Sequence, residues 1–108
     1  MRLLAALLAT ALPAAAQSVL VEYECERGAV IHAAYVNEAE PGIVILMVEG
    51  RMVELRQEPS GSGIRYGAAE TDEGYVWLSR GNEAMLLYRY EGVEEEPILI
   101  GGCVERPR

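Results

Sequence analysis

Apolar and polar side chains alternate with a period of two along much of this chain. Between residues 19 and 26, Val19, Val21 and Tyr23 alternate with positions that include three glutamates, a pattern typical of a strand with one buried face. Residues 43–48 are apolar on both faces. No stretch combines a helical period with capping residues, so the pattern favours strands throughout.

Eight segments with strand character follow one another, separated by short turns rich in glycine and acidic residues. Gly81-Asn82 has the composition of a two-residue hairpin turn, and Gly101-Gly102 weakens the last segment. The sequence therefore predicts an all-β fold, a small antiparallel barrel of about eight strands. The predicted strands are residues 19–26, 29–36, 43–48, 51–57, 64–69, 75–80, 83–90 and 98–104.

The first sixteen residues carry a different pattern. Met1 and Arg2 form a basic start, residues 3–12 are apolar, and Pro13 is followed by three alanines. This order predicts a secretory signal peptide, residues 1–16, cleaved to leave residues 17–108 as one domain. The apolar run is shorter than the roughly 20 residues that a membrane-spanning helix needs. No cysteine lies nearby to carry a lipid, so we expect a soluble exported protein without a membrane anchor.

The chain is acidic, with a formal net charge of −8 at pH 7. Loss of residues 1–16 would remove one arginine and no acid, which changes this charge to −9. A surface of this sign argues against nucleic acid as a partner and allows attraction to a basic protein, although it also serves solubility alone. The chain has no lysine, so its nine Lys+Arg residues are all arginines.

Two cysteines, Cys25 and Cys103, lie near the two ends of the predicted domain. In an exported protein we expect them to form a disulfide, which on a chain-entropy basis stabilises the fold by about 4 kcal/mol. Full antiparallel pairing of the first and last strands would put them at opposite ends, out of bonding range. Either Gly101-Gly102 breaks the last strand or the closing register is staggered, and we expect the break. Together with the single His32 they do not make a ligand set, so we expect no metal and no cofactor.

Ser62 stands between Gly61 and Gly63, where the freedom of the glycine backbone lets its hydroxyl project from the domain. In a meander, alternate connections lie at the same end of the barrel. The loop that carries Ser62 and the hairpin that follows Arg80 should therefore share one rim.

The same strand counting places the other connections. It assigns the loop 37–42, with Glu38 and Glu40, to the rim of Ser62. The acidic turns around Asp72 and Glu95 belong to the far end.

Several segments resemble the inhibitors of c-type lysozyme, a bacterial family with membrane-bound and periplasmic branches. They are Tyr23-Glu24-Cys25, residues 60–66 (SGSGIRY), residues 75–84 (YVWLSRGNEA) and the late Cys103. The specific motifs are Ser-Gly-x-x-Tyr, ending at Tyr66, and an aromatic-Trp-x-x-Lys-Gly-like segment. The likeness covers nearly all of residues 17–108, and it implies a small eight-stranded barrel located in the periplasm.

The resemblance also implies a mode of action. In the family, the motif serine and lysine enter the lysozyme cleft and contact its two catalytic carboxylic residues, roles that correspond to Ser62 and Arg80. Gly61, Gly63, Tyr66 and Gly81 would support the two loops. The implied partner is c-type lysozyme, a basic protein, and the chain would not be an enzyme.

The chain departs from the family pattern at two positions. Arg80 stands where lysine is usual, and its planar fork is bulkier and prefers bidentate geometry. Val76 stands where an aromatic residue is usual.

Two other functions are open from the residues alone. One is a small envelope barrel that binds an apolar ligand or another envelope protein, which requires a hollow interior in the first case. The other is a hydrolase that uses Ser62, for which the chain offers no credible base, because His32 lies in an early strand. The oligomeric state is left open.

Overall fold

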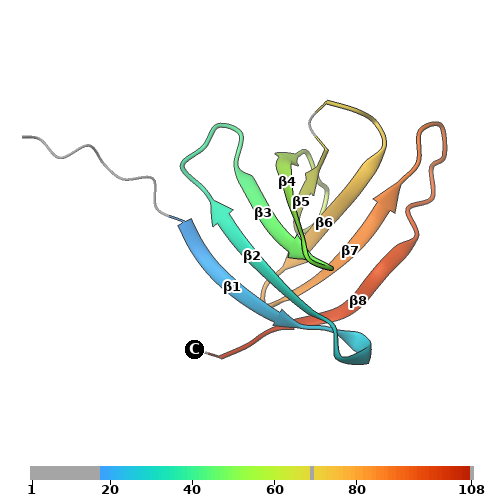
Figure 1. The fold of residues 1–108 in the computed structure, drawn as a ribbon. Helices are drawn as coiled ribbons and strands as arrows, with labels where there is room; N and C mark the ends of the chain where they lie inside the picture. Colours follow the sequence, from blue (N-terminus) through green and yellow to red (C-terminus); the bar gives the residue numbers. More distant parts are fainter. Residues whose placement is uncertain (1–17, 69, 108) are drawn as a thin grey trace, which may run out of the picture.

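A computed structural model of the chain, described for residues 18–68 and 70–107, is a closed antiparallel barrel (Figure 1). Each strand pairs with its neighbours in sequence, and β8 returns to β1. The predicted all-β barrel is confirmed. Its elements are β1 (Ser18–Glu24), the 3-10 turn η1 (Glu26–Gly28), β2 (Val30–Val36), β3 (Ile43–Val48), β4 (Arg51–Glu58), β5 (Ile64–Gly67), β6 (Gly74–Arg80), β7 (Glu83–Arg89) and β8 (Ile98–Glu105).

The predicted signal peptide, residues 1–16, and its cleavage point lie outside the described residues, so both stay predictions. Within the described ranges, no helix has the length and apolar character needed to cross a membrane.

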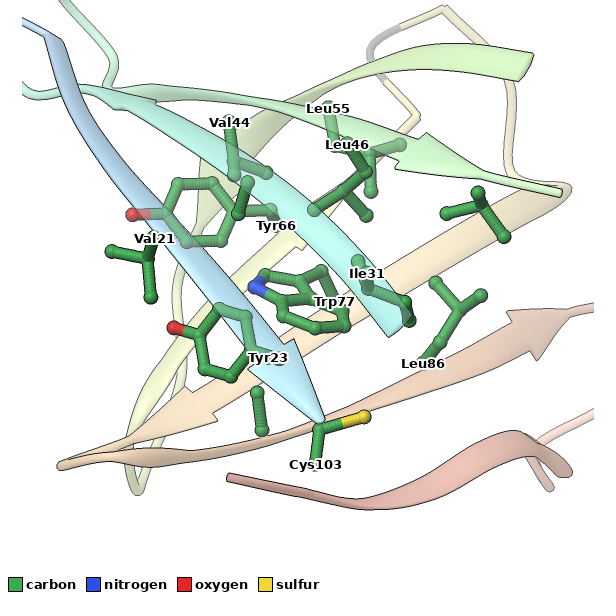
Figure 2. Close-up of a cluster of buried hydrophobic side chains, with 13 residues drawn as sticks. Val21, Tyr23, Ile31, Val44, Leu46, Leu55, Tyr66, Trp77, Leu86 and Cys103 are labelled. Carbon is green, nitrogen blue, oxygen red and sulfur yellow. The ribbon is translucent and has the colours of Figure 1, made fainter. Parts of the chain in front are cut away.

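The barrel interior is filled by side chains from all around the sheet, with Trp77 of β6 fully buried in the middle of the cluster (Figure 2). Its indole Nε1 donates a hydrogen bond of 2.8 Å to the hydroxyl of Tyr35, which also lies 2.7 Å from the hydroxyl of Tyr23. The ring of Tyr23 meets the indole edge-on, with centroids 5.2 Å apart. Burial, followed by the contact with Tyr35, raises the pKa of Tyr23. The centre of the barrel is thus filled by packed aromatic rings whose polar groups are hydrogen-bonded to one another.

The barrel closes through a short, staggered pairing of β1 with β8. Only Tyr23 with Glu105 and Glu24 with Val104 pair directly. One step further along this register, Cys25 faces Cys103, and the two form the predicted disulfide.

The expected break at Gly101-Gly102 is wrong, because β8 continues through both glycines to Glu105. The stagger alone brings the cysteines together. The glycines contribute a local irregularity, since Gly102 has a φ of +60° and the register between β7 and β8 shifts between Ala84 and Leu87.

Replacing Tyr35 by Phe tests the polar contact inside the barrel. The substitution keeps the ring but removes the acceptor of the buried indole N–H and the partner of the Tyr23 hydroxyl. We expect the free energy of unfolding, measured in urea, to fall by about 1–3 kcal/mol. Tyr75→Phe is the matched control, because the Tyr75 ring packs on Tyr88 and its hydroxyl bonds to no described residue. Equal losses in the two variants would contradict this assignment.

Candidate functional site

Two connections meet at one exposed rim of the barrel. Residues 59–63 join β4 to β5, and residues 81–82 join β6 to β7. Because Ile64 pairs with Ser79, the first connection lies beside the end of β6. Nη2 of Arg80 donates a hydrogen bond to Oγ of Ser62. The predicted adjacency of these two residues is confirmed, whereas their role stays a prediction.

Ser60, which the sequence analysis did not single out, shapes the loop. Its hydroxyl donates to the carbonyl oxygen of Ser62 at 2.7 Å and accepts from the N–H of Ser62 at 3.3 Å. This is the local turn that a serine makes with the backbone two residues ahead, so the Ser60-Gly61-Ser62 spacing was an available signal. The turn leaves the Ser62 hydroxyl exposed and next to Arg80.

The three glycines proposed as loop support differ in what the structure requires of them. Gly63 has a φ of +71°, and a Cβ there would lie 2.7 Å from the carbonyl oxygen of Ser79, so both conformation and close approach exclude a side chain. Gly81 needs only its φ of +59° in the hairpin turn. Gly61 has open space around it and no positive φ, so it keeps the loop tip slim without being sterically required.

Tyr66 lies in the core rather than at the rim. It is 2% exposed, and its ring centroid lies 5.9 Å from that of Tyr35. Burial raises the pKa of its hydroxyl. Any support it gives to Ser62 therefore acts by fixing β5, the strand that follows the loop.

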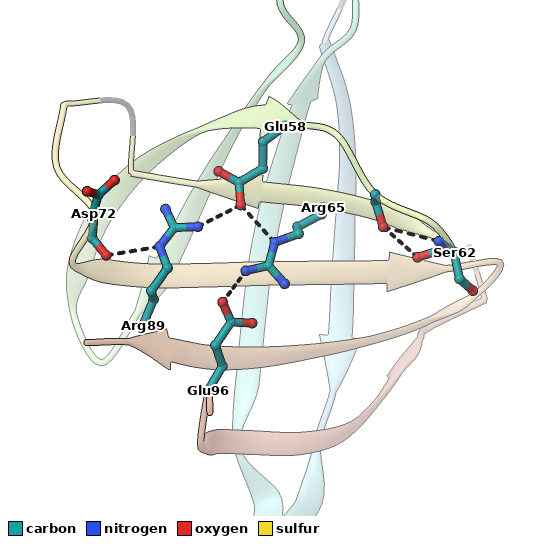
Figure 3. A network of polar contacts seen from close by, with 7 residues as sticks. Glu58, Ser62, Arg65, Asp72, Arg89 and Glu96 are labelled. Carbon is teal, nitrogen blue, oxygen red and sulfur yellow. Dashed lines mark hydrogen bonds and ion pairs between the residues drawn. The ribbon is translucent and has the colours of Figure 1, made fainter. Parts of the chain in front are cut away.

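An ion-pair network closes the base of the Ser62 loop on the outer face of the sheet (Figure 3). Glu58 ends β4 and pairs in register with Arg65 of β5, so these residues stand on either side of the loop. Oε1 of Glu58 accepts from Nε of Arg65 at 2.7 Å and from Nη1 of Arg89 at 2.8 Å. Nη2 of Arg65 donates to Glu96 from the connection between β7 and β8. These four side chains are between 17% and 25% exposed, which limits screening by water.

The partners in this network shift the ionisation of its members. Burial by itself would raise the pKa of Glu58, but the hydrogen bonds from Arg65 and Arg89 outweigh it and lower the pKa below its ordinary value. The hydrogen bond to Glu96 contributes most to the raised pKa of Arg65. Gly67 makes room for the network, since a Cβ there would lie 2.5 Å from Oε2 of Glu58.

The placement of the loop 37–42 beside Ser62 is wrong. Arg56 of β4 pairs both with Ile43, which follows this loop, and with Gly67, which ends β5. Pro41 accordingly borders the same groove as Gly67. The backbone N–H of Gln57 donates to the carbonyl oxygen of Gly42 at 2.7 Å, and Gln57 pairs with Tyr66, four residues after Ser62. The loop therefore meets the end of β5 that lies away from Ser62. Glu38 and Glu40 therefore do not belong to the Ser62 rim.

The acidic connections are placed partly as expected. Asp72 precedes β6, whereas Arg80 ends it, so the turn around Asp72 lies at the far end of that strand. The connection that contains Glu95 also leaves from that end, after Arg89. However, Glu96 lies over the outer face of the sheet and contacts Arg65, a return path that strand counting does not reveal.

The site presents a cation and a hydroxyl, and among the described residues no base lies beside Ser62. Arg80 forms no ion pair with any residue in 18–68 or 70–107, so its guanidinium is available to an external acid. His32 bonds Glu22 of β1 at 2.8 Å and does not serve Ser62 as a base. In the described part of the chain, no three His, Cys, Asp or Glu side chains gather where a metal could bind.

Comparison with known protein families gives a match over residues 23–95, more than half of the chain. The matched family is described as the membrane-bound lysozyme-inhibitor of c-type lysozyme. The chain belongs to this family. Among solved structures, it is similar to a periplasmic lysozyme inhibitor of C-type lysozyme from Salmonella typhimurium, with a TM-score of 0.70 and 20% identity over 84% of this chain and 100% of the other. At that identity the likeness supports the barrel fold alone. No curated protein matches the chain.

The lowered pKa of Glu58 predicts a specific pH dependence. Its ionised form is stabilised by Arg65 and Arg89, so this contribution is complete above the ordinary pKa of 4.5 and is lost as the pH falls through the lower folded value. We expect Glu58→Gln to be less stable than the parent at neutral pH, and the gap to shrink in acid. Urea unfolding at several pH values between about 7 and 3 measures it.

Glu54→Gln is the control for this series, because Glu54 lies on the same strand and forms no ion pair with a described residue. Its stability should follow that of the parent at every pH. A gap between the Glu58→Gln variant and the parent that stays constant from neutral to acid pH would contradict the assignment.

Proposed function

We propose that this protein inhibits c-type lysozyme by inserting the Ser62 loop and the Arg80 hairpin into the enzyme's cleft. The observation that carries the proposal is the contact between Arg80 and Ser62 on an exposed rim, in a chain of the lysozyme-inhibitor family. The proposal includes export to the periplasm, which rests on the composition of residues 1–16.

The chemistry of the target supports this arrangement. A retaining glycosidase such as lysozyme uses two carboxyl groups roughly 5 Å apart, one as an acid and one as a carboxylate. Ser62 uses one N–H of Nη2 of Arg80. The other N–H groups of this guanidinium bond to no described residue, so they remain donors for a carboxylate. The positive charge would also favour ionisation of the catalytic acid, which removes the proton that the reaction requires.

Ser62 complements the guanidinium. A serine hydroxyl has one proton to donate and two lone pairs to accept with, and in this structure its oxygen accepts from Arg80. Its own proton remains available for the second carboxyl group. A cation and a neutral donor held together would thus engage both acids and exclude the sugar.

Arginine in place of the usual lysine strengthens this internal contact. A guanidinium has separate nitrogens, so Arg80 can donate to Ser62 and still present an edge to a carboxylate, whereas an ammonium acts as a single point charge. We therefore expect this chain to hold its two contact residues in one fixed arrangement before binding.

Neither alternative function gains support from the described residues. Core side chains occupy the space that an apolar ligand would need in a hollow barrel. A hydrolase would need a base beside Ser62, where the structure has the cation Arg80.

The proposal predicts that purified residues 17–108 slow the lysis of bacterial cells by c-type lysozyme. Lysozymes of the g-type and i-type, assayed in parallel, should be affected much less, because the fit is to one cleft. The decrease in turbidity of a cell suspension measures lysis. An unchanged rate at about a tenfold molar excess of the protein would eliminate the proposed function.

The double substitution Ser62→Ala with Arg80→Ala tests the mechanism. Loss of contacts at the centre of an interface costs at least about 2 kcal/mol, so affinity for c-type lysozyme should fall about 30-fold or more. Titration calorimetry measures the affinity. Arg51→Ala, at the start of β4 and at the opposite end of that strand from the Ser62 loop, removes one arginine as a control and should bind like the parent. A double variant that binds as tightly as the parent would show that other surfaces carry the inhibition.

A further inference from the structure

Few side chains in residues 18–68 and 70–107 contact the Ser62 loop. Apart from the turn made by Ser60, the hydrogen bond from Arg80 is the side-chain contact that reaches Ser62 from this part of the chain. Gly61 has open space around it, so the backbone at the tip of the loop can rotate, whereas Gly63 is packed against the carbonyl oxygen of Ser79 at the end next to β5. The direction in which the hydroxyl points therefore depends on how the base of the loop is fixed.

The base of the loop is fixed by Arg65. Glu58 and Arg65 are directly opposed in the ladder, and their 2.7 Å ion pair ties the strand that enters the loop to the strand that leaves it. β5 is only four residues long and begins at Ile64. Arg65 is its second residue and lies three positions after Ser62. A displacement at Arg65 would reach Ser62 through two residues of chain.

Two arms of one guanidinium make this connection. Nε of Arg65 binds Glu58 while Nη2 binds Glu96, a residue 31 positions further along the chain. Glu58 is in turn held by Arg89 of β7. The loop base is thereby tied to β7 and to the connection that follows it, which gives β5 an external support that its short ladder lacks.

We propose that Arg65 is a positioning residue for lysozyme inhibition: by bridging Glu58 and Glu96, it holds the Ser62 hydroxyl in the direction needed to meet the enzyme's carboxyl group. This inference rests on the proposed function. Arg65 itself lies on the outer face of the sheet, and it acts through Ser62.

The test is a cycle of four proteins: the parent, Arg65→Met, Ser62→Ala and the double variant. Affinity for c-type lysozyme is measured for each. If Arg65 acts through Ser62, Ser62→Ala weakens binding by about fivefold more in the parent than in the Arg65→Met background. Equal losses in both backgrounds mean that Arg65 is independent of Ser62, which overturns the inference.

Two variants separate positioning from charge. Arg65→Lys keeps the charge but loses the two-armed fork, so it should behave like Arg65→Met. Arg56→Met removes the same charge from the same outer face, at a residue that pairs with no acid among the described side chains, and should bind like the parent. Parent-like behaviour of Arg65→Lys, or a loss in Arg56→Met equal to that in Arg65→Met, would indicate a charge effect and overturn the inference.

A measurement without lysozyme distinguishes failure of this inference from failure of the proposed function. In Arg65→Met, the backbone order parameters of Ser62 and Gly63 from nitrogen relaxation should fall from about 0.85 toward 0.6, with those of Leu46 unchanged. If the parent does not bind lysozyme but this change occurs, only the proposed function fails. If the order parameters do not change, Arg65 does not position the loop. Should Arg65→Met not fold, Glu96→Gln replaces it: this variant removes the ion pair between Arg65 and Glu96, and the same affinities and order parameters are measured.

Discussion

The fully buried indole of Trp77 is the contact on which the rest of the barrel depends. It lies on β6, and side chains from the first, second, third and seventh strands converge around it. Since its N–H is satisfied by Tyr35, the centre of the barrel contains a polar group without an unpaired donor. A well-filled interior fixes the register of every ladder, because a slip of one residue would turn its apolar side chains outward.

The register of the strands also determines the arrangement of the rim that carries Ser62 and Arg80. The pairing of Ile64 with Ser79 places the Ser62 loop against the end of β6, and Gly63 allows an approach that no other residue could make. The contact of Ser62 with Arg80 is thus produced by ladders whose order is set in the core. On the outer face, Arg65 and Glu58 add a second layer of control at the base of the same loop.

Much of this was predictable from local patterns. Period-two alternation located all eight strands, and counting them brought Ser62 and Arg80 to one end. Counting failed for Glu38 and Glu40, because it assumes that each strand runs alongside both neighbours for its whole length. β4 instead pairs with β3 along its first part and with β5 only at its end, where Arg56 serves both.

The Arg65–Glu96 ion pair and the staggered closure of the barrel could not be predicted from local patterns, because both depend on contacts between distant parts of the chain. The bond between Arg65 and Glu96 joins residues 31 positions apart, and no periodicity encodes which arginine meets which acid. The staggered closure that unites Cys25 with Cys103 is set by the tilt of strands around the whole barrel, which no single segment specifies.

That closure has a consequence for how the protein responds to proteolysis. With Cys25 bonded to Cys103, the backbone between them is a covalent ring. A protease that cuts one peptide bond anywhere in this ring opens it without releasing a fragment. Residues 59–63, the exposed loop that carries Ser62, lie within the ring, and the ladders of β4 and β5 would still hold both cut ends in register. The domain is therefore built to survive a nick in this exposed loop.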